Sequence, residues 1–112
     1  MHKKSQQEYI DGVRARVAQL AQGMLDSSVD YLEGANELSN LHHEAGVADD
    51  DEDFTVFALI SSETDALPIG ASRQHWSANA LHAHESKIKQ ALAWAKAISH
   101  GHCESLVKRF GN

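Results

Sequence analysis

Residues 78–99, ANALHAHESKIKQALAWAKAIS, decide the fold class of this chain because they carry its clearest helical pattern. Apolar side chains recur there in steps of three and four, a spacing that places them on one face of an α-helix. Ser77 is a suitable N-cap, and His100-Gly101 predicts the end of the helix. The expected buried face comprises Leu81, Ile88, Ala91, Leu92, Ala95 and Ile98.

Four further segments show the same periodicity. Residues 6–25, 29–44 and 51–61 are predicted helices, and residues 103–110 are predicted to form a separate short final helix. A chain of 112 residues has the size of one domain. We therefore expect residues 1–112 to form a single helical domain, an all-α compact bundle of four to five helices.

The composition is that of a soluble globular protein. No uncharged stretch approaches the roughly 20 apolar residues of a membrane span. The first residues turn polar where a signal peptide would turn apolar. Cys103 is the single cysteine and cannot form an internal disulfide, which is typical of a reducing compartment. These features predict a cytoplasmic protein.

Charge is distributed unevenly along the chain. Twelve acidic residues and no lysine or arginine lie between Arg16 and Arg73, whereas both flanking segments are basic, and the net charge is −6. A field of this sign repels nucleic acid and anionic lipid and attracts a basic protein. The sequence therefore predicts a basic protein partner, with no nucleic-acid or membrane partner.

The acidic run Asp49–Asp53 has two interpretations. Carboxylates in the first turn of a helix are stabilised by its macrodipole, which accounts for only part of the run. The alternative is a docking surface, which requires these carboxylates to stay unneutralised by the basic C-terminal segment. The run lacks the alternating ligands and glycine of an EF-hand calcium loop. The candidate partner-binding residues are Asp26, Asp30, Tyr31, Glu33, Glu37, Asp49, Asp50, Asp51, Glu52 and Asp53, with Tyr31 expected to reach the surface as an aromatic anchor.

Eight histidines raise the question of a metal site. Zinc ligands on one helix face are three or four residues apart, so neighbouring or alternate histidines do not share a face. His100, His102 and Cys103 lie at a predicted helix boundary, where the geometry is freer, and a distant residue such as His42 could complete a site. A small metal-binding protein is therefore the alternative function, although the main expectation includes no metal and no cofactor.

Catalytic signals are weak. Cys103 with His100 or His102 is the only nucleophile–base candidate, and cysteine hydrolases usually draw this pair from separate elements. The chain has no phosphate-binding glycine loop, nucleophile elbow or dinucleotide fingerprint. We therefore expect no enzyme and assign no catalytic residues.

The segment 62–76, SETDALPIGASRQHW, contains the only proline. Pro68 and Gly70 would shape a turn. Arg73 could pair with Glu63 or Asp65 and so fix the loop. A structural lock is favoured over a binding role, with Glu63, Asp65, Pro68, Gly70, Arg73 and Trp76 as its residues and Trp76 filling the core beneath.

This segment resembles a Ser-Glu-Thr-Asp-x-x-Pro-x-Gly-x-x-Arg-x-x-Trp loop shared by a family of small helical bacterial proteins. The resemblance extends to a Glu33-Gly34 pair and to an Asp-Phe-x-x-Phe helix at Asp53, Phe54 and Phe57. Such proteins are similar to the immunity proteins of contact-dependent growth inhibition systems. The resemblance implies a protein that binds a toxin domain, often a basic nuclease such as an RNase, and blocks its substrate site with acidic residues.

Overall fold

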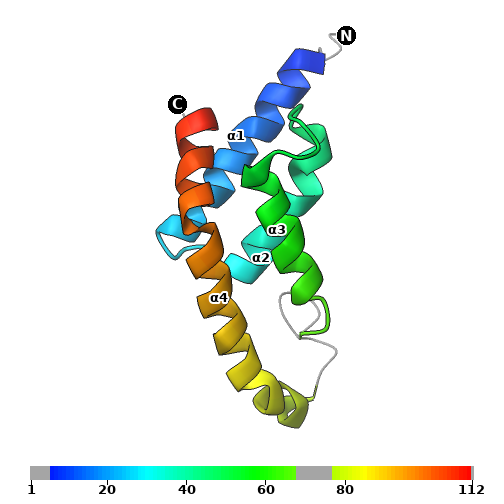
Figure 1. Ribbon diagram of the computed structural model, residues 1–112, viewed down its shortest axis with the longest axis vertical. Helices are drawn as coiled ribbons and strands as arrows, with labels where there is room; N and C mark the ends of the chain where they lie inside the picture. Colours follow the sequence, from blue (N-terminus) through cyan, green and yellow to red (C-terminus); the bar gives the residue numbers. More distant parts are fainter. Residues whose placement is uncertain (1–5, 68–76, 112) are drawn as a thin grey trace.

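The computed structural model describes residues 6–67 and 77–111. Within these ranges the chain forms four α-helices and one 3-10 turn, with no strand (Figure 1). The prediction of an all-α bundle is confirmed. The elements are α1 (Gln6–Leu25), α2 (Tyr31–Leu41), η1 (His42–Glu44), α3 (Glu52–Glu63) and α4 (Ala78–Phe110).

Helix α4 runs along the whole bundle and contacts each of the other three helices. Helix α1 lies beside the C-terminal half of α4, and the start of α1 and the end of α4 lie at the same end of the molecule (Figure 1). Helices α2 and α3 pack closely against each other. Neither described part of the chain contains a helix with the length and apolarity of a membrane span.

The core collects one face from each helix. Among the described residues, Phe54 and Phe57 of α3 are its largest fully buried side chains. Met24, Leu32 and Leu38 belong to the same cluster, and each is at most 1% exposed. Burial of such side chains from water is the main stabilising contribution to the fold.

Capping side chains explain where three helices begin. Ser77 accepts a hydrogen bond from the Ala80 amide at 3.1 Å, which confirms the predicted start of α4. Asp30 caps α2 and Asp51 caps α3 in the same way. These side chains satisfy backbone N–H groups that have no partner inside the helix.

The prediction that His100-Gly101 ends a helix is wrong, because α4 continues without a break for 33 residues. Glycine costs about 1 kcal/mol relative to alanine inside a helix. The buried face nevertheless continues past it at helical spacing, through Ala95, Ser99, Cys103 and Leu106. Packing of this continuous stripe outweighs the cost of one exposed glycine.

The predicted buried face of α4 is only partly correct. Ala95 is buried, and Ala91, Leu92 and Ile98 pack against the core while staying partly exposed. Leu81 and Ile88 are intermediate in exposure and do not belong to the core of the described residues.

Candidate protein-docking surface

The acidic run does not form a uniform exposed patch. Asp51 is the N-cap of α3, and the guanidinium of Arg109 binds its carboxylate with both nitrogens, at 3.0 and 2.8 Å. The same guanidinium donates to Asp53 Oδ2 at 2.8 Å. Asp49, Asp50 and Glu52 are exposed. Arg109 of the basic C-terminal segment thus pairs with two of the five acids and leaves three at the surface.

Asp53 is the centre of a polar cluster between α3 and α4. Its carboxylate also accepts hydrogen bonds from His102 Nδ1 at 2.8 Å and from Ser105 Oγ at 2.7 Å. We call the five residues Asp51, Asp53, His102, Ser105 and Arg109 the Arg109 latch. The latch joins the first turn of α3 to the last turns of α4.

The contacts of the Arg109 latch lower the pKa of both carboxylates, Asp51 and Asp53. The Arg109 bond lowers the pKa of Asp51 below its usual value. Burial alone would raise the pKa of Asp53, but hydrogen bonds from Ser105, His102 and Arg109 outweigh burial, and the net shift is downward. Both carboxylates therefore stay ionised at neutral pH and attract the Arg109 cation.

The segment between η1 and α3 is fastened upstream of the latch as well. Arg14 of α1 donates to the carbonyls of Ala45 and Gly46, at 2.7 and 3.0 Å. The His42 ring donates Nε2–H to the carbonyl of Ala48 at 2.9 Å, and it stacks on Phe54 with ring centroids 4.9 Å apart. Side chains from three elements hold the backbone on which Asp49 and Asp50 lie.

The acids of the α1–α2 region are partly engaged within the chain. Asp30 is the N-cap of α2, and its carboxylate accepts hydrogen bonds from the amides of Leu32 and Glu33. Glu37 forms an ion pair with Arg16 at 3.1 Å, and both side chains are half-exposed. A hydrogen bond from the Ser28 hydroxyl, followed by one from its amide, lowers the pKa of Asp26. Glu33 is exposed.

The prediction that Tyr31 reaches the surface is wrong. Its exposed fraction is 7%, and its hydroxyl lies 3.3 Å from His100 Nδ1 on α4. Burial raises the pKa of the Tyr31 hydroxyl, with smaller contributions from Cys103 and Glu104. The signal was present in the sequence, because Tyr31 shares a helical face with Ala35 and Leu38, four and seven residues further on.

The candidate metal residues are not brought together. His100 contacts Tyr31 of α2 and Glu104 of α4, whereas His102 contacts Asp53 of α3. Cys103 is fully buried, and burial raises the pKa of its thiol to about 12. In residues 6–67 and 77–111 no three His, Cys, Asp or Glu side chains are arranged as metal ligands.

The predicted structural loop falls mostly outside the described residues. Glu63 ends α3 and Asp65 follows it, and both are exposed. Pro68, Gly70, Arg73 and Trp76 lie outside the described ranges, and so does the predicted pairing of Arg73 with Glu63 or Asp65.

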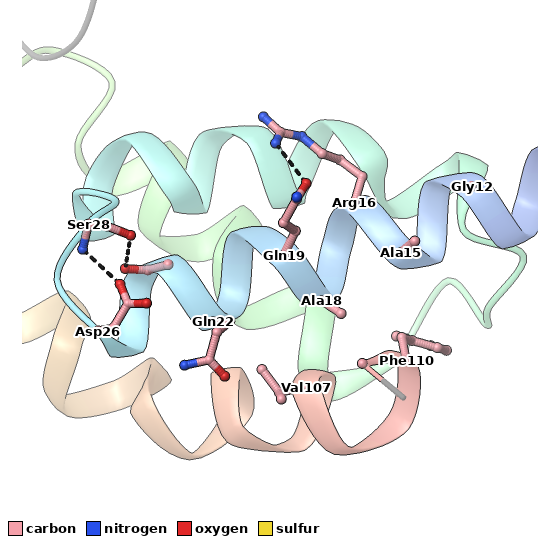
Figure 2. A pocket seen from close by; sticks show the side chains of 12 residues that line it. Gly12, Ala15, Arg16, Ala18, Gln19, Gln22, Asp26, Ser28, Val107 and Phe110 are labelled. Atoms are coloured by element: carbon pink, nitrogen blue, oxygen red, sulfur yellow. Dashed lines mark hydrogen bonds between the residues drawn. The ribbon is translucent and has the colours of Figure 1, made fainter.

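A shallow groove between α1 and the end of α4 escaped the sequence analysis (Figure 2). Its volume is about 690 Å³. Figure 2 shows Ala18 and Gln22 of α1 on the side that faces Val107 and Phe110 of α4. The guanidinium carbons of Arg14 and Arg109 lie 5.3 and 4.8 Å from the centre of the Phe110 ring. The small residues Gly12, Ala15 and Ala18 of α1 were a sequence signal for it.

Comparisons with known proteins return nothing: no protein family, no curated protein and no solved structure matches this chain.

Proposed function

We propose that this protein is an immunity protein that binds a cognate bacterial toxin domain and neutralises it by stoichiometric binding, without catalysis. One observation carries the proposal: Asp49, Asp50 and Glu52 remain exposed on a segment that Arg14, His42 and the Arg109 latch hold in place. A fastened group of carboxylates suits a cationic protein surface better than a freely moving one, because less ordering is needed on binding.

The proposed partner is a basic nuclease domain, such as an RNase, whose substrate site is lined by cations. Carboxylates of the immunity protein would take the place of RNA phosphates there and exclude the substrate. Complementary charge of this kind mainly accelerates encounter and sets selectivity. The proposed site of action is the cytoplasm of the producing cell.

Affinity requires a buried anchor in addition to charge. Since Tyr31 lies in the core, we propose Tyr9 for this role. Tyr9 is 47% exposed, and its hydroxyl donates to Glu44, which directly precedes the fastened segment. An amphipathic aromatic side chain beside a charged patch is a common composition for the centre of an interface.

Charge neutralisation tests the proposal. The double variant Asp49→Asn/Asp50→Asn should associate roughly tenfold more slowly with the cognate toxin domain at low salt, and the difference should fade at high salt. The dissociation rate should change little. The control variant Glu63→Gln/Asp65→Asn removes the same charge from exposed positions outside the segment, and its association should stay close to wild type.

The readouts are association kinetics and rescue of growth when the toxin domain is co-expressed. Equal association rates for both double variants at low salt would remove the acidic segment from the mechanism. A toxin domain that the wild-type protein neither binds nor neutralises would refute the proposed function itself.

A further inference from the structure

The backbone between η1 and α3 is held from two sides by different helices. Upstream, Arg14 and His42 bind the carbonyls of Ala45, Gly46 and Ala48. Downstream, the segment ends at Asp51, whose amide donates to the Ala48 carbonyl at 3.1 Å. Oδ1 of Asp51 accepts hydrogen bonds from the Asp53 amide and from Arg109, and Oδ2 accepts a second one from Arg109.

We propose that Arg109 is a positioning residue. It ties the N-cap of α3 to the last turn of α4 and so holds the acidic segment, residues 45–51 between η1 and α3, in one conformation. Its planar fork spans both oxygens of Asp51 and reaches Asp53 as well. The two bonds to Asp51 restrict the carboxylate that caps the helix, and the bond to Asp53 anchors the guanidinium beside it. Asp51 and Asp53 consequently act on binding through the order of the segment, while Asp49, Asp50 and Glu52 supply the exposed charge.

The shape of the guanidinium matters for this role. Two parallel N–H groups match the two oxygens of a carboxylate, whereas a lysine ammonium is a point charge with no fork. Lys108 precedes Arg109 in the same turn and is exposed. It offers a matched control, because its loss changes the net charge equally without touching the latch.

Hydrogen exchange in the free protein tests the proposal. The amides of Asp51, Asp53, Phe54 and Thr55 all donate to acceptors in residues 48–51, so their exchange reports the order of the segment. In Arg109→Gln these four amides should exchange about tenfold faster than in wild type, because charge-assisted bonds to the cap are lost. Arg109→Lys should lie in between, and Lys108→Gln should match wild type.

Amides in the middle of α2 serve as the reference for global opening, and in each variant they should accelerate by no more than the loss of global stability that urea unfolding measures for that variant. Unaltered exchange at the four reporter amides in Arg109→Gln would overturn the proposal. Protection of the four reporter amides in Arg109→Gln as high as that of the α2 amides would also overturn it, because the segment would then open only when the whole protein unfolds.

The consequence for binding rests on the proposed function, but the exchange measurement needs no partner. The proposed role of Arg109 can therefore be refuted without refuting toxin binding, and toxin binding can be refuted without refuting the role of Arg109.

Discussion

Replacing Asp53 with asparagine separates a structural carboxylate from a partner-binding one. The side chain is only 16% exposed and accepts hydrogen bonds from His102, Ser105 and Arg109. Asparagine keeps the shape but removes the charge and turns one acceptor into a donor. At least one of the three bonds is then lost, and the Arg109 cation faces a neutral group.

The cost follows from these contacts. A hydrogen bond to a charged group contributes about 1.5–3 kcal/mol and a neutral one about 1 kcal/mol. Asparagine retains one acceptor, and Arg109 keeps its partner Asp51. We therefore expect a loss of about 2 kcal/mol in the free energy of unfolding, which lowers Tm by roughly 10 °C in a domain of this size.

Urea unfolding followed by circular dichroism measures the effect. Asp50→Asn is the control, because its side chain is exposed, and it should change stability by no more than about 0.5 kcal/mol. If Asp53→Asn were as stable as Asp50→Asn at neutral pH, the latch would contribute nothing measurable.

The pH dependence provides a second check. Asp53 has a lowered pKa in the folded state, since its hydrogen bonds outweigh burial. Its contribution is therefore complete above the unfolded pKa of about 3.9 and is lost as pH falls through the lower folded pKa. The difference between wild type and Asp53→Asn should shrink at about pH 3, and a constant difference would contradict the assigned charge.

Two further predictions concern the glycines and the cysteine. Gly101→Ala should raise stability by about 0.5–1 kcal/mol, because an added Cβ meets nothing within 4 Å. Gly34→Ala should lower stability by about 1–3 kcal/mol, because its Cβ would lie 2.5 Å from Sδ of the fully buried Met24. Thermal unfolding in which both variants change Tm in the same direction would contradict this reasoning. Burial, with a smaller effect of Glu104, raises the pKa of the Cys103 thiol to about 12, so alkylation at neutral pH should be slow in the native protein and fast in denaturant. Native reactivity equal to that of a free thiol would show that Cys103 is accessible.

Periodicity and capping chemistry predicted most of the helices. The bounds of α1 are those expected, and Ser77 caps α4 as predicted. These features depend on residues within one turn of each other, so they are visible in the sequence. The length of α4 was not visible in the sequence. The cost of Gly101 in helix stability is local, whereas the packing that outweighs it involves the whole bundle.

The amino-acid sequence alone determined the class of fold and the excess of negative charge in the first two thirds of the chain. Only the tertiary structure decided which carboxylates remain at the surface. Arg109 lies 58 residues from Asp51 in the chain, and no local pattern predicts that their side chains meet. Tyr31 was expected at the interface but lies in the core for a related reason, because α4 covers the face of α2 that carries it. Charge content is a sum over residues, but the availability of a charge depends on which helices pack together.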